Sequence, residues 1–164
     1  MATPEVPQFG ALLREHIQAI PPEAQPAFLA GLERSAAARY RDWAQQLPDH
    51  ADALLGCARR EDEIADIVSG LFPASPGHRK RIDEVLPAAV QVYYDVFAPY
   101  SPIEQLYLQS EAEIQGSQAW VNLTERLGDS ATEHVRRELA RCTELELASS
   151  QVVKDLLDAE TVGA

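Results

Sequence analysis

Residues 101–127 read SPIEQLYLQSEAEIQGSQAWVNLTERL and contain a complete helix signature. The segment opens with Ser101-Pro102-Ile103-Glu104, in which serine and glutamate form a capping box and proline occupies the first helical position. Apolar and small residues then recur at steps of three and four, which is the spacing of one helix face. These residues are Ile103, Leu106, Ser110, Ile114, Ser117, Trp120, Val121 and Leu127. The segment therefore predicts a long amphipathic helix that ends at Gly128-Asp129-Ser130.

Prolines divide the rest of the chain into pieces of helical length, because proline lacks an amide donor and clashes inside a helix. The breaks are Pro21-Pro22, Pro48, 73–76 and 99–102. Apolar residues between the breaks keep the helical spacing, and no stretch alternates as a half-buried strand does. Ser130 followed by Glu133 predicts a second capping box, which would start the last long helix. The predicted fold class is all-α.

The 164 residues predict one helical domain, because this length is typical of a single core. Two helical hairpins are expected, over about 27–70 and 103–157, with a bundle core over about 27–157. A crossover at 72–101 would join them and carry a short helix, interrupted or kinked near Pro87, and residues 1–22 would add a short N-terminal helix. This layout is a four-helix bundle with one long connection.

The charge balance excludes several classes of partner. The chain has 26 acidic and 14 basic residues, a formal net charge of −12, so it would repel nucleic acid and anionic membranes. No apolar run approaches the roughly 20 residues of a membrane span, and residues 1–5 lack the features of a signal peptide. We therefore expect a cytoplasmic protein with no nucleic-acid or membrane partner and with Cys57 and Cys142 reduced.

Several glutamates fall on the apolar faces, where a carboxylate must be paired, protonated or bound to a cation. Rotation by 100° per residue places Glu33, Glu61 and Glu113 on the apolar faces of the first three long helices. On the fourth, Glu144 and Glu146 flank the face on either side of Leu145. Each long helix therefore offers a candidate inward glutamate.

The set resembles the ligand pattern of the ferritin-like superfamily of di-iron and di-manganese proteins. In that family the first and third helices each supply a glutamate, and the second and fourth each supply Glu-x-x-His. Over about residues 27–157 the resemblance implies Glu33, Glu61, Glu113 and Glu144 as metal ligands. It implies a ferritin-like bundle in which a divalent metal, Fe or Mn, is bound, although an absent metal is equally compatible with the pattern.

The chain departs from that pattern at both histidines, because Ile64 and Leu147 stand where they would be. A second register, Glu63-x-x-Asp66 with Glu146-x-x-Ser149, places polar groups there but turns Glu63 away from the apolar face. An all-carboxylate site suits Mn²⁺, Ca²⁺ or Mg²⁺ better than a redox iron pair. Di-iron oxidase chemistry is therefore not expected.

Two other functions are compatible with the same residues. In the first, the glutamates pair with arginines such as Arg34, Arg60 and Arg141 or lie at helix edges as solvated charges, and the bundle is a non-enzymatic interaction or scaffold protein without metal. In the second, a small molecule binds between the helices, although no residue is diagnostic of it. Leu108 and Leu147 lie opposite the apolar faces, and exposed leucines mark subunit interfaces. Together with the resemblance they predict a homodimer, and a further protein partner is compatible with them.

Overall fold

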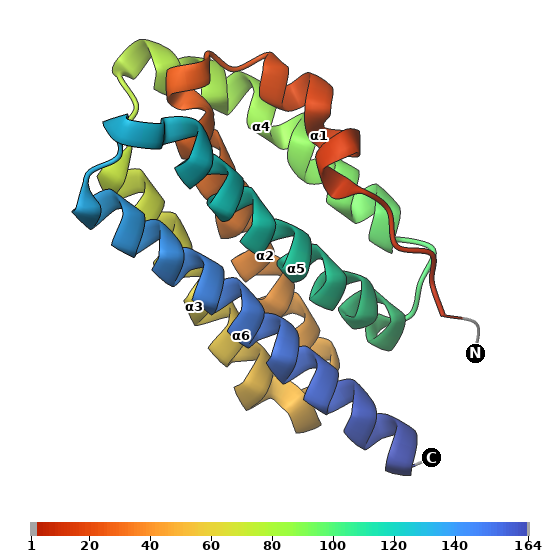
Figure 1. The fold of residues 1–164 in the computed structure, drawn as a ribbon. Coiled ribbons are helices and arrows are strands. Elements are labelled where there is room, and N and C mark those ends of the chain that lie inside the picture. Colours follow the sequence, from red (N-terminus) through yellow and green to blue (C-terminus); the bar gives the residue numbers. More distant parts are fainter. Residues whose placement is uncertain (1–2, 164) are drawn as a thin grey trace.

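A computed structural model describes residues 3–163 of the chain, with side chains over 3–161. The described residues form six helices and no strand, which confirms the all-α class. The helices are α1 (Phe9–Gln18), α2 (Gln25–Gln46), α3 (Ala51–Leu71), α4 (Pro76–Phe97), α5 (Pro102–Leu127) and α6 (Glu133–Gly163) (Figure 1). Short 3₁₀ turns at Pro22–Ala24, Pro48–His50 and Gly128–Ser130 connect some of them.

The start of α5 has the predicted capping box. The Glu104 amide donates to Ser101 Oγ at 3.4 Å, and the Ser101 amide donates to Glu104 Oε2 at 2.9 Å. Gly128 ends the helix with a φ of 52°, a conformation that residues with a Cβ rarely adopt. The second predicted capping box is wrong, because Ser130 Oγ donates back to the Leu127 carbonyl instead. Thr132 Oγ1 accepts the Val135 amide and so caps α6.

The four long helices α2, α3, α5 and α6 form two antiparallel hairpins. α2 packs along α3, α5 packs along α6, and α3 contacts α6 (Figure 1). α4 packs on α2 and on α1, and α1 also contacts α5, so α1 and α4 together cover one side of the hairpins. None of the helices in residues 3–163 is both long and apolar enough to cross a membrane.

The crossover differs from the prediction, because its helix is long. α4 spans 22 residues and passes through Pro87. Pro87 lies on the exposed side of α4, whereas Ile82, Ala89 and Phe97 are buried on the other side, so the carbonyl that loses its helical donor lies toward solvent. The helix begins at Pro76, because Ser75 Oγ accepts the His78 amide at 3.2 Å and caps it there.

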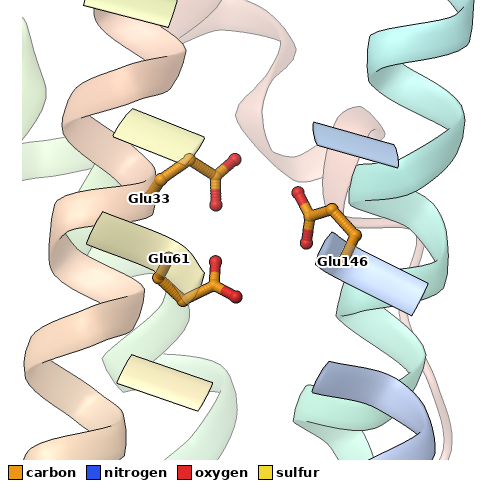
Figure 2. A group of neighbouring side chains, drawn as sticks. All are labelled: Glu33, Glu61 and Glu146. Atoms are coloured by element: carbon orange, nitrogen blue, oxygen red, sulfur yellow. The ribbon is translucent and has the colours of Figure 1, made fainter. Parts of the chain in front are cut away.

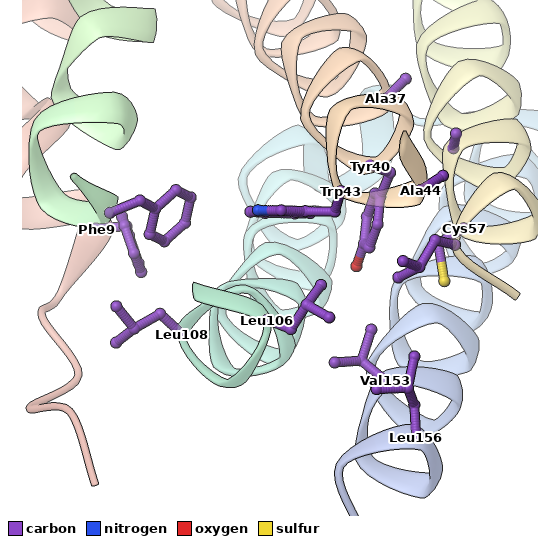
Figure 3. Close-up of a cluster of buried hydrophobic side chains, with 13 residues drawn as sticks. Phe9, Ala37, Tyr40, Trp43, Ala44, Cys57, Leu106, Leu108, Val153 and Leu156 are labelled. Carbon is purple, nitrogen blue, oxygen red and sulfur yellow. The ribbon is translucent and has the colours of Figure 1, made fainter. Parts of the chain in front are cut away.

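The position of Leu108 also corrects an expectation. Its side chain is fully buried, in a cluster with Phe9 and Phe97, and it lies on the side of α5 that faces Phe9 (Figure 3). The sequence predicted an exposed leucine because the faces of α5 were judged against the hairpins alone, whereas α1 and α4 cover its outer side. Leu147 on α6 does remain exposed, at 46%.

Candidate metal centre

Three glutamate carboxylates from three helices meet between the hairpins. Glu33 on α2, Glu61 on α3 and Glu146 on α6 each place one oxygen within 4.8 Å of the others. Their side chains point toward one another across the space between the helices (Figure 2). Glu61 and Glu146 are buried, and Glu33 is partly exposed. The structure thus brings together two of the four predicted ligands, Glu33 and Glu61, with a glutamate from the last helix.

Glu113, the predicted ligand on α5, lies beside this cluster and is held by hydrogen bonds. Its Oε1 accepts the Tyr40 hydroxyl at 2.6 Å and Gln109 Nε2 at 2.7 Å. The side chain is 2% exposed, and its charge helps raise the pKa of Glu61 and of Glu146. One oxygen of Glu113 therefore has two protein donors in place of water.

The fourth predicted ligand, Glu144, lies outside the cluster. Glu144 is exposed at the surface, whereas Glu146 is 1% exposed and accepts Trp120 Nε1 at 2.9 Å. The buried residues of α6 include Cys142, Glu146 and Ser150 at steps of four, which is one helix face. Glu144 lies two residues from Cys142, about 200° around the helix, so it points away.

A spacing in the sequence could have selected Glu146. Buried residues of α3 follow the order leucine, cysteine, glutamate and valine at 54, 57, 61 and 68, and α6 repeats it at 139, 142, 146 and 153. The register with Glu61 therefore predicts Glu146 rather than Glu144. Glu63, from the alternative register, lies at the surface and pairs with Arg141.

Gly116 on α5 leaves the space that the Glu146 carboxylate occupies. A Cβ atom at position 116 would lie 2.8 Å from Glu146 Oε1, closer than real Cβ atoms approach an oxygen. The carboxylate would have to shift to accommodate any larger residue. Gly116 therefore belongs to the site although it has no polar side chain. The sequence alone did not identify it.

Burial dominates the electrostatics of the cluster. Loss of water raises the pKa of Glu33 from 4.5 to about 7 and raises the pKa values of Glu61 and Glu146 well above the normal range, with neighbouring carboxylates adding to the effect for these two. Glu61 is fully buried, and neither of its carboxylate oxygens has a hydrogen-bond partner. A buried carboxylate without a donor must hold a proton or bind a cation.

The arginines expected to neutralise these glutamates point elsewhere. Arg34 pairs with Asp62 and Asp66 at the surface, and Arg141 pairs with Glu63. Arg60 directs Nη1 to the sulfur of Cys57 at 3.6 Å. Among the side chains that the structure describes, the three arginines form no ion pair with the clustered glutamates. The structure therefore contradicts the charge-pairing explanation of these residues.

The buried cysteines beside the cluster do not supply a thiolate. Cys57 and Cys142 lie one helical turn before Glu61 and Glu146 and are fully buried. Burial raises the pKa of Cys57 to about 11 and that of Cys142 to about 12. Without a metal both remain neutral thiols at pH 7, and the side chains that meet between the helices are the three carboxylates.

Comparison of the chain with protein-family models, with curated proteins and with solved structures finds no match in any of the three. The geometry and chemistry of the cluster are therefore the basis for its function.

Proposed function

We propose that the protein is a ferritin-like four-helix bundle, with α4 as its crossover helix, that binds a divalent cation through glutamates of different helices. The observation that carries this proposal is Glu61. Both of its oxygens are buried without a donor, within reach of Glu33 and Glu146. A cation among the three would supply the partner that no described side chain supplies. Glu113, beside them, is available as a fourth ligand.

The donor chemistry favours a hard cation. Carboxylate oxygens suit Mn²⁺, Mg²⁺ and Ca²⁺, whereas imidazole and thiolate ligands favour other metals. His50 and His78 contact Glu160 and Glu23 at the surface, so neither reaches the cluster. The site therefore lacks the imidazoles that the resemblance associates with redox iron, and we propose cation binding without oxidase activity.

The proposal is tested by titrating Mn²⁺ into EDTA-treated protein, with calorimetry and thermal melting as readouts. Wild-type protein should bind Mn²⁺ and melt at a higher temperature when the ion is present, because the ion binds only the native state. Glu61→Gln and Glu146→Gln should each weaken binding at least tenfold.

Each variant has a matched control on the same helix. Glu63→Gln and Glu144→Gln remove the same charge two residues away, from a partly exposed and an exposed position, so they should bind Mn²⁺ like the wild type. Equal losses from the buried and exposed substitutions would show only general charge attraction. That result, or a wild-type melting temperature unmoved by Mn²⁺, Mg²⁺ and Ca²⁺, would overturn the proposal.

A further inference from the structure

A cavity of about 130 Å³ borders the glutamate cluster on its α1 and α4 side. It lies between α1, α2, α4 and α5, and Glu33, Glu113 and Glu146 form part of its wall. The space exists because α2 and α5 present small residues to each other, namely Ala36, Ala112, Gly116 and Ala119. The rest of the wall is largely apolar, with Leu13, Ile17, Leu29 and Leu32.

Arg39 also lines this cavity and is a buried cation without an anion. Its side chain is 3% exposed, and its guanidinium carbon lies 4.5 Å from the centroid of the Tyr93 ring. Nη1 donates to Ser35 Oγ at 3.1 Å and Nη2 donates weakly to Gln109 Oε1 at 3.4 Å, whereas Nε has no partner. Over the side chains of residues 3–161, no carboxylate forms an ion pair with Arg39.

A buried charge normally has a counter-ion, and a guanidinium fits a carboxylate through two parallel hydrogen bonds. A divalent cation would offset two of the glutamate charges, whereas Arg39 still has no carboxylate in direct contact. The cavity size limits that partner to a small molecule, since an engineered apolar cavity of about 150 Å³ takes up benzene. The missing anion is therefore small and carries an apolar portion.

We propose that this cavity binds a short-chain monocarboxylate of about four to six carbons, with its carboxylate on Arg39 and its alkyl chain against the apolar wall beside Glu33. The inference rests on the proposed function in one respect, because the bound cation offsets two of the carboxylate charges that would repel the ligand. It adds a ligand class to the site, and it identifies Arg39 as a binding residue.

The test is calorimetric titration of pentanoate into Mn²⁺-loaded protein, with pentanamide as a neutral ligand of the same shape. Pentanoate should bind at least tenfold more tightly than pentanamide, because hydrogen bonds between charged groups are lost with the amide. Acetate should bind more weakly by about fourfold for each methylene removed. This comparison needs no variant, so it does not depend on how a substitution folds.

Arg39→Met should abolish the preference for pentanoate over pentanamide, while the matched variant Arg41→Met should keep it. Arg41 lies on the same helix but is exposed and pairs with Asp62, so the two variants lose the same charge. A purely structural role of Arg39 would lower the melting temperature without changing the ratio of the two affinities. Equal affinities for the two ligands in wild-type protein would overturn the inference.

A metal-free variant separates this inference from the proposed function. Glu33→Gln/Glu61→Gln neutralises two carboxylates without a cation, so it should bind pentanoate with the same preference over the amide. If this variant binds pentanoate but the wild type does not bind Mn²⁺, the proposed function is overturned and the inference stands. Mn²⁺ binding by the wild type, with no pentanoate binding by either protein, would overturn the inference alone.

Discussion

The buried carboxylates predict that metal-free protein loses stability as the pH rises. Glu33 has a pKa of about 7 in the folded state against 4.5 as its ordinary value, so the folded state binds more protons between these pH values. Its contribution is complete below pH 4.5 and is lost as the pH rises through 7. At about 1.36 kcal/mol per pKa unit, the total is about 3 kcal/mol, most of which is lost between pH 5 and pH 8.

The assay is thermal and urea unfolding of EDTA-treated protein from pH 5 to pH 8, followed by circular dichroism. A loss of about 2–3 kcal/mol corresponds to a fall of about 5–10 °C in melting temperature for a chain of this size. Glu61 and Glu146 act in the same direction, because their pKa values are also raised by burial. The observed fall should therefore be at least as large.

Glu33→Gln isolates the contribution of one carboxyl group. Its amide does not ionise, so the stability lost between pH 5 and pH 8 should shrink by about 2–3 kcal/mol relative to wild type, whereas Glu63→Gln should keep the wild-type pH dependence. Saturating Mn²⁺ should reverse the trend, since the ion replaces protons and binds better at high pH. Stability that is constant or rises from pH 5 to pH 8 in metal-free wild type would refute the reasoning.

Three further substitutions probe the site and its surroundings. Gly116→Ala should weaken Mn²⁺ binding at least tenfold in calorimetry, because its Cβ would lie 2.8 Å from Glu146 Oε1, whereas Gly70→Ala, which meets no atom within 4 Å, should bind normally. Tyr40→Phe removes one donor from the buried Glu113 carboxylate. The free energy of unfolding in urea should therefore fall by about 1–3 kcal/mol. Leu147→Lys should convert the homodimer predicted from the sequence to a monomer in sedimentation velocity, and a wild-type monomer at micromolar concentration would contradict the dimer.

Local rules predicted the helices and much of the cluster. Capping residues and apolar spacing located the start of α5, and the same spacing placed Glu33, Glu61 and Glu113 on inward faces. These predictions succeed because each depends on the rotation of a single helix relative to its own apolar residues. No knowledge of the neighbouring helices was needed.

Glu144 shows where single-helix reasoning is insufficient. Leu145 lies between two glutamates, so the apolar face of α6 alone does not separate Glu144 from Glu146. The phase of α6 is set by its contact with α5, where Gly116 leaves room for the Glu146 carboxylate and Trp120 donates to it. Both features belong to another helix, over 25 residues away in sequence.

The crossover was the other feature that local rules misjudged. Pro87 indicated an interrupted or kinked helix, yet Ser75 caps a continuous helix whose exposed side carries Pro87. Leu108 lies in the same buried cluster as Phe9 of α1 and Phe97 at the end of α4, so both helices contribute to its burial. Tertiary packing therefore determined both outcomes.

The most direct test of the central claim is anomalous diffraction from crystals soaked in Mn²⁺. The account predicts a manganese peak between α2, α3 and α6, within coordination distance of Glu33, Glu61 and Glu146, that disappears in Glu61→Gln crystals. Anomalous density confined to surface carboxylates, with the interior cluster empty at saturating Mn²⁺, would contradict it.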